Sequence, residues 1–142
     1  MFKISTKSQY GLRAMTYLAK CKKKICPLRE ISNGEGISFD YLEKIISKLE
    51  KSGLVKAKKG THGGYCLSKK PIKIKVGEIL YSLESDKQLI KCISHGSSKK
   101  TICSRERQCC ARPLWKKIHD SLNKTLNSIT LADLIKWKKE FI

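Results

Sequence analysis

The chain has 142 residues with a hydrophobic fraction of 40%, which predicts a single domain with its own core and excludes a disordered or collagen-like chain. Lys and Arg total 31 against 12 Asp and Glu, so the formal net charge is +19, and such an excess attracts polyanions through counterion release. No apolar stretch approaches the ~18 residues of a transmembrane helix and the N-terminus lacks the apolar segment of a secretory signal, so we expect a cytoplasmic protein without a membrane partner.

The positive charge is concentrated in the first half of the chain. Residues 1–75 carry 18 basic and 5 acidic residues, and residues 76–142 carry 13 and 7. Nucleic acid is the polyanion that this distribution favours, although a lysine-rich surface without a specific partner has the same composition. An anionic membrane surface is less favoured, because no basic amphipathic anchor is present.

Two helices are predicted in the first 36 residues. Apolar residues at helical spacing predict a helix over 5–20, with Thr6 or Ser8 as its N-cap. A second, short helix is predicted to begin near Pro27, which is tolerated at a first helical position, and to be broken by the Asn-Gly-Glu-Gly run at 33–36.

The clearest helix is predicted over 39–52, with Ser38 as its N-cap and Gly53 at its C-terminal end. With the preceding short helix and its glycine-bearing turn it predicts a helix-turn-helix. Polar residues lie off its apolar stripe and toward its N-terminal end, where a major groove would meet them. The candidate DNA-contacting residues of this segment are Ser38, Asp40, Tyr41, Glu43, Lys44 and Lys48.

Residues 54–68 predict a β-hairpin, because two strand-like runs flank the glycine-rich residues 60–64. A hairpin directly after a helix-turn-helix is interpreted as a wing, with a tip thin enough to enter a minor groove. An ordinary surface hairpin with a lysine-rich strand is the alternative. The candidate DNA contacts of the hairpin are Lys58, Lys59, His62 and Gly63.

The second half of the chain predicts three further helices. Residues 72–76 alternate as in a strand, which predicts a short extended piece before a helix over 76–84. Residues 85–112 have no sustained period. Pro113 opens a long amphipathic helix. Thr130 and Asp133 form a sequence like a capping box, which predicts a last helix over 131–140.

Several short segments occur in an order and spacing typical of one family. They are ISTKSQYGLRAM at 4–15, ISFDYLEK at 37–44, GLV at 53–55 with GGY at 63–65, VGEI at 76–79, LW at 114–115 and TLADL at 130–134. On these segments the chain resembles the IscR-like winged-helix regulators, bacterial dimeric transcription factors that include iron–sulfur and nitric-oxide sensors and a cysteine-metabolism repressor.

The resemblance implies a mainly α fold, a winged helix-turn-helix with a β-hairpin wing and a long C-terminal dimerisation helix. It implies that the helix after Ser38 reads operator DNA, that the hairpin contacts the minor groove, and that the helix beginning near Pro113 crosses its twin in a homodimer. We therefore divide the chain into a DNA-binding region at 1–84, a cysteine-rich loop at 85–112 and a region at 113–142 that holds the dimerisation helix and the last helix.

Seven cysteines without a secretory signal favour thiols, a metal or redox chemistry over a disulfide framework. Cluster-binding members of the resembled family place three cysteines just before the Leu-Trp of the dimer helix. The resemblance thus implies a 2Fe–2S cluster on Cys92, Cys103 and Cys109, metal ligands of the thiolate type. The gap of ten residues between the first two is longer than the five common in the family. Cys21 and Cys66 are expected to be small buried hydrophobes and Cys26 a loop thiol.

The fourth ligand is open between Cys110 and His95. One branch of the family has a histidine where Arg112 stands, and another has an aspartate where Gln9 stands. Two other states of these cysteines compete with the cluster: structural zinc and unligated, redox-reactive thiols.

The predicted function is a homodimeric, non-enzymatic regulator that binds double-stranded DNA and senses iron–sulfur or redox status. Lys44, Lys48 and the two wing lysines would anchor phosphates, while Asp40, Tyr41 and Glu43 would face base edges. One alternative is a cluster-free regulator of the same fold that responds to thiols or metabolites, and another is a basic zinc module that binds RNA. A thiol redox enzyme is disfavoured, because the sequence has no Cys-x-x-Cys and no set of nucleophile, base and orienting group.

Overall fold

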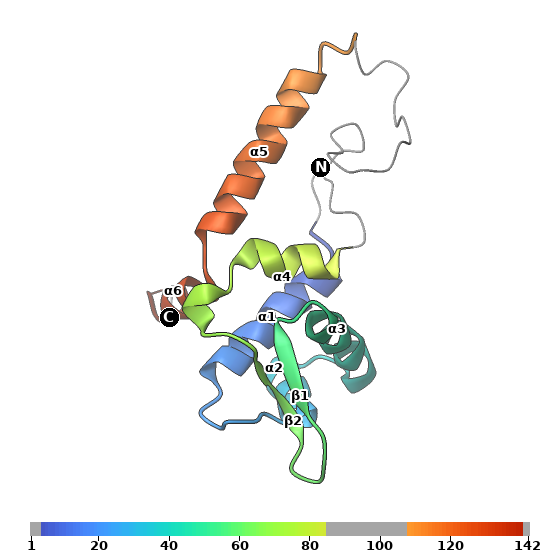
Figure 1. The fold of residues 1–142 in the computed structure, drawn as a ribbon, viewed down its shortest axis with the longest axis vertical. Helices are drawn as coiled ribbons and strands as arrows, with labels where there is room; N and C mark the ends of the chain where they lie inside the picture. The colour runs from blue at the N-terminus through green and yellow to red at the C-terminus, as the bar shows by residue number, and fades with distance from the viewer. Residues whose placement is uncertain (1–3, 85–107, 141–142) are drawn as a thin grey trace.

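The computed structural model describes residues 4–84 and 108–140 (Figure 1). The elements are α1 (Thr6–Lys20), α2 (Leu28–Glu35), α3 (Phe39–Lys51), β1 (Val55–Lys58), β2 (Gly64–Leu67), a 3-10 turn η1 (Pro71–Lys73), α4 (Val76–Leu83), α5 (Arg112–Ser128) and α6 (Leu131–Glu140). Every helix predicted within these ranges is present, and so is the hairpin. None of the described helices is long and apolar enough to cross a membrane.

The core forms around α1, which packs against α2, α3, α4 and α6. Met15 on α1, Ile45 on α3, Ile79 on α4 and Leu131 on α6 are all within 1% of complete burial. Burying each such side chain contributes about 1.5–3 kcal/mol. The last helix therefore shares the core of the N-terminal region, although it follows α5 in the chain.

The N-terminus of α1 is capped by Ser5, so the predicted caps at Thr6 and Ser8 are wrong. Ser5 has extended backbone angles, and its Oγ accepts the backbone N–H of Ser8 at 3.1 Å. The hydroxyls of Ser5 and Ser8 both donate to Oε1 of Glu84, which ties the start of α1 to the end of α4. Partial burial raises the pKa of the Glu84 carboxyl, but these hydrogen bonds and the charge of Lys7 outweigh it and hold the pKa below its usual range.

We expect Glu84→Gln to lower the free energy of unfolding by about 1 kcal/mol, because the amide accepts the two hydroxyls less strongly than a carboxylate does. A carboxyl whose pKa is depressed on folding stabilises the protein above its unfolded pKa, ~4.3 for glutamate, and the stabilisation is lost as the pH falls through the folded value. Thermal unfolding of both proteins from pH 3 to pH 7 measures this. A difference that does not shrink toward pH 3 would contradict it.

Helix α2 ends three residues later than predicted. It runs through Asn33, Gly34 and Glu35 and stops at Gly36, whose φ of 62° lies in the left-handed region that favours glycine. Pro27 is the N-cap rather than the first helical residue.

The turn into α3 is braced from α2. The guanidinium of Arg29 lies 5.2 Å from the ring centroid of Phe39, the first residue of α3. Such a cation–π contact fixes the two helices of the helix-turn-helix relative to each other.

The predicted hairpin is present and has an additional partner at its base. Val55 pairs with Leu67 and Lys58 with Gly64. Cys26, in the segment between α1 and α2, exchanges two backbone hydrogen bonds with Tyr65, of 2.9 and 2.8 Å. Cys26 lies in a loop, as predicted, but it is 1% exposed, because backbone pairing with β2 brings this residue into the core.

The segment before α4 differs from the predicted extended piece, because residues 71–73 form the turn η1. Ile72 is exposed on it and Ile74 is fully buried after it. The junction of α5 and α6 is tied to this segment, since Leu131 N–H donates to the carbonyl of Ile74 at 2.8 Å. The predicted capping box of α6 is confirmed: Thr130 N–H donates to Oδ2 of Asp133 at 2.9 Å, and Asp133 N–H donates to Oγ1 of Thr130 at 3.3 Å.

Helix α5 begins one residue before Pro113 and projects from the other helices (Figure 1). None of its residues is buried. It touches α4 through polar groups, the hydroxyl of Tyr81 donating to Oδ1 of Asn123, whose amide nitrogen lies 2.8 Å from Nε2 of His119. Within the described residues, the apolar stripe of α5 therefore lies outside the hydrophobic core that the other helices share.

Candidate nucleic-acid interface

Helix α3 has two chemically different faces. Leu42, Ile45, Ile46 and Leu49 are 0–1% exposed and fix one face on the core. The opposite face and the N-terminal end are turned to solvent. Ser38, Asp40, Glu43, Lys44 and Lys48 all lie on this solvent side, so the structure brings the predicted polar residues of α3 together on one open surface.

Tyr41 is half-buried and is held against α1. Its ring meets that of Tyr10 edge to face, with centroids 5.9 Å apart and an interplanar angle of 80°. The guanidinium of Arg13 lies 5.4 Å from the Tyr10 centroid, and its Nε lies 3.0 Å from Oε2 of Glu35. These contacts link the first turn of α3 to α1 and α2 and leave Tyr41 a fixed orientation.

The tip of the hairpin carries the remaining predicted contacts. Lys58, Lys59 and His62 are exposed there. Gly63 N–H donates to the carbonyl of Gly60 at 2.9 Å, which closes the turn. A Cβ on Gly63 would stand 2.4 Å from the carbonyl oxygen of Lys58, so this tight tip requires glycine. We call β1, β2 and the connecting residues 59–63 the wing; it extends beyond the helices, and β1 packs against α3 (Figure 1).

The cations of this surface have no acidic partner within the described part of the chain. The two ion pairs found there, Arg13 with Glu35 and Lys23 with Glu30, involve neither α3 nor the wing. Repulsion from Lys7 is the main cause that lowers the pKa of Lys48, with desolvation second. A phosphate bound between two adjacent cations relieves their mutual repulsion. This surface therefore favours a polyanion as its ligand.

Lys7 is a further cation of this surface that is not among the predicted DNA contacts. It stands in the first turn of α1, far in sequence from α3, and only the packing of α1 on α3 brings it beside Lys48. No local pattern marks it in the sequence.

The predicted cluster ligands are described only in part. Cys92, His95 and Cys103 lie outside the described residues. Cys109 is half-buried and Cys110 exposed, both as free thiols immediately before α5. The carbonyl of Cys109 accepts the N–H of Arg112 at 3.3 Å. The described thiols are therefore placed at the N-terminus of the helix that the resemblance makes the dimer helix.

Comparisons with known proteins agree with this architecture. Residues 4–137 match the Rrf2 family, described as an iron-dependent transcriptional regulator. The HTH-type transcriptional regulator IscR of Escherichia coli is 34% identical over 134 residues, which cover 94% of this chain and 80% of the relative.

Two solved structures share the fold over nearly the whole chain. The structure of T. potens IscR superposes with a TM-score of 0.76 at 37% identity, covering 97% of this chain and 89% of that one. CymR, the global cysteine regulator of B. subtilis, gives a TM-score of 0.72 at 35% identity, covering 96% and 98%. These relatives are regulators and not enzymes, in agreement with the predicted class. The winged-helix fold is likewise confirmed, and the chain belongs to the Rrf2 family of transcriptional regulators.

Proposed function

We propose that this regulator works in the cytoplasm as a homodimer that binds operator DNA through α3 and the wing of each protomer. The observation that carries the proposal is the set of exposed lysines on α3 and the wing, which have no acidic partner among the described residues. Lys44, Lys48, Lys58 and Lys59 bind phosphates and set the register on the duplex, and the acidic residues Asp40 and Glu43 face base edges. A carboxylate accepts from cytosine N4 and repels phosphate, so these two residues sharpen discrimination rather than add affinity.

The homodimer is supported by α5. Six apolar residues of α5 and its C-cap recur at helical spacing, and none of them is buried in the single chain. Leu114 alone is 54% exposed. A projecting amphipathic helix of this kind is stabilised when a second copy covers its stripe. The stripe consists of Leu114, Trp115, Ile118, Leu122, Leu126 and Ile129.

The test of operator binding is selection from fragments of the source genome, followed by fluorescence anisotropy at one fixed salt concentration. We expect recovered fragments to bind at least ~10³-fold more tightly than bulk competitor DNA, the usual lower limit for a specific site. The proposal is contradicted if the protein binds selected DNA no more tightly than bulk DNA or than RNA of the same length. Binding would then be nonspecific.

We further propose that Cys92, Cys103 and Cys109 hold a 2Fe–2S cluster. Thiolates are the ligands such clusters take, the described thiol of Cys109 is half-buried and free, and the matched family is described as iron-dependent. When bound, the cluster supplies a centre that responds to oxidants and to iron supply. Cys109 positions that centre next to α5, the proposed dimer helix. Gain or loss of the cluster would then change the angle between the two DNA-binding regions of the dimer.

We expect anaerobic reconstitution with iron and sulfide to give visible absorption that Cys103→Ala and Cys109→Ala abolish and that Cys66→Ala leaves intact. Comparing Cys110→Ala with His95→Ala identifies the fourth ligand. A colourless protein whose equivalent of zinc is lost in Cys103→Ala and Cys109→Ala would point to a structural zinc site on these cysteines instead.

A cluster-free regulator is the second candidate. The similarity to CymR, named as a global cysteine regulator, and the long interval between Cys92 and Cys103 favour it. It is distinguished by operator affinity that stays the same after reconstitution but changes with thiol oxidation or an added metabolite.

A further inference from the structure

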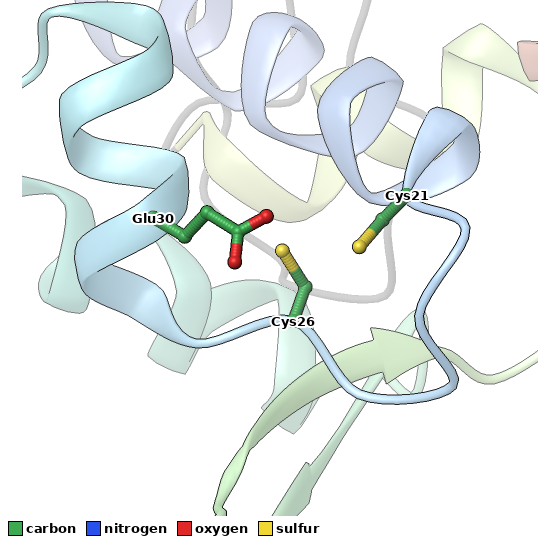
Figure 2. Close-up of side chains that lie close together, drawn as sticks. All are labelled: Cys21, Cys26 and Glu30. Atoms are coloured by element: carbon green, nitrogen blue, oxygen red, sulfur yellow. The ribbon is translucent and has the colours of Figure 1, made fainter.

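Two cysteines and a glutamate meet at the C-terminal end of α1, away from the start of α5 (Figure 1). Cys21 is the C-cap of α1, Cys26 pairs with β2, and Glu30 lies in the first turn of α2. One ligand atom from each lies within 4.8 Å of the other two, and the two sulfurs and the carboxylate point toward one another (Figure 2). We propose that these three residues bind one Zn²⁺-class ion, with a water molecule at the fourth position.

The donor set and its spacing suit this ion. Zinc takes thiolate at ~2.3 Å and carboxylate at ~2.0–2.2 Å in a tetrahedral arrangement, which places neighbouring donor atoms within about 4 Å of one another. The cluster needs only a small contraction to reach that geometry. The Cys-x₄-Cys interval is also within the range of structural zinc sites.

The site combines a buried donor with an open approach. Cys26 is 1% exposed, whereas Cys21 and Glu30 line an open hollow of about 640 Å³ that also borders Tyr17 and Lys20. An ion with its water reaches the two outer donors from solvent, and the inner thiol closes the site. On binding, both thiols release a proton, so that two thiolates and a carboxylate surround the dication with a net charge of −1.

The surrounding cations limit which ions bind. Nζ of Lys23 lies 2.6 Å from Oε2 of Glu30, in a pair that is largely exposed to solvent. The second carboxylate oxygen remains for the ion, while Lys23 offsets the negative charge of the complex. The lysines around the hollow repel weakly held, oxygen-seeking cations such as Mg²⁺ and Ca²⁺, whereas thiolate bonding offsets this repulsion for zinc.

An ion at this position connects three parts of the domain. Cys26 is bonded through its backbone to Tyr65 on the wing, and a Cβ on Gly64 would stand 2.3 Å from the Cys26 carbonyl oxygen. The ion therefore fastens the wing base to the end of α1 and the start of α2.

The test uses the 142-residue chain with Cys92, Cys103, Cys109 and Cys110 replaced by Ser, reduced and free of metal. We expect one equivalent of Co²⁺ to bind with the sulfur-to-cobalt charge-transfer and visible bands of a tetrahedral site, and Zn²⁺ to displace it. Cys21→Ser abolishes these bands and Glu30→Gln weakens binding, while Cys66→Ser, which alters a half-buried thiol on β2, leaves both unchanged. Zn²⁺ also raises the melting temperature of the parent but not of Cys21→Ser.

Circular dichroism shows whether Cys21→Ser is folded, and Glu30→Gln gives an independent reading if it is not. The proposal is overturned if the reduced parent binds no stoichiometric Co²⁺, or if Cys21→Ser binds it equally well. A Cys21–Cys26 disulfide that forms in air, in a chain that takes no metal when reduced, would make the pair a redox couple and not a metal site. None of these readouts involves DNA, so they are separate from the test of operator binding.

Discussion

The double substitution Ile118→Lys/Leu122→Lys is expected to convert the regulator into a monomer. Each side chain loses about 1.5–3 kcal/mol of apolar burial, and a two-fold interface contains both residues twice. The free energy of dimerisation then falls by at least ~6 kcal/mol, which is roughly a 10⁴-fold increase in the dissociation constant. Sedimentation equilibrium over a range of concentrations measures it.

The same variant is expected to lose operator affinity by about 10²–10⁴-fold, because two separate half-sites no longer share an effective concentration. Lysine raises the net positive charge, so this loss cannot come from weaker attraction to DNA. Ser121→Lys/Ser128→Lys adds the same charge to exposed positions of α5 and should remain dimeric. A monomeric wild-type protein, or an Ile118→Lys/Leu122→Lys variant that stays dimeric, would remove α5 from the interface.

Local patterns in the sequence predicted those parts of the fold that depend on near neighbours. The apolar stripe of α3 became its buried face, and the capping pair Thr130 and Asp133 became hydrogen bonds of α6. The stop of α2 was misplaced because Gly34 is helical and only Gly36 takes the left-handed conformation. The φ of a glycine depends on the turn that follows it. The composition of the run 33–36 does not show which of its two glycines adopts a positive φ.

Parts that depend on distant neighbours were missed. Cys26 is buried because Tyr65, almost forty positions away, pairs with its backbone. The proximity of Lys7 to Lys48 has the same origin. For the Cys21–Cys26–Glu30 cluster, the Cys-x₄-Cys interval was a usable local signal. The position of Glu30 opposite both sulfurs required the packing of α2 against α1.

The residues predicted to contact DNA fall into two groups, which differ in how exposed and how firmly packed their side chains are. The lysines are exposed and form no ion pair within 4–84 and 108–140, as charge-neutralising contacts need. Tyr41 is fixed by Tyr10 and offers one edge in one orientation. A fixed aromatic edge and nearby carboxylates suit base discrimination, whereas long flexible cations suit the phosphate backbone.

The double substitution Lys44→Ala/Lys48→Ala is therefore expected to change the salt dependence of operator binding. Each lost phosphate contact lowers the slope of log K against log salt by ~0.9, and a dimer loses four such contacts, so the slope falls by about 3–4. Affinity at low salt falls for operator and bulk DNA alike, and the ratio between them changes little, because Asp40 and Glu43 remain in place.

Lys116→Ala/Lys124→Ala is the matched control, since it removes the same charge from exposed positions on α5, which projects away from the wing (Figure 1). If only the net charge of the protein determines its attraction to DNA, both variants change the slope equally. The proposed contacts of the α3 lysines with phosphates would then be contradicted. If the lysines of α3 touch phosphates, the control keeps a slope close to that of the wild type. An α3 variant that keeps its slope but loses preference for operator over bulk DNA would instead reverse the assignment and make these lysines base readers.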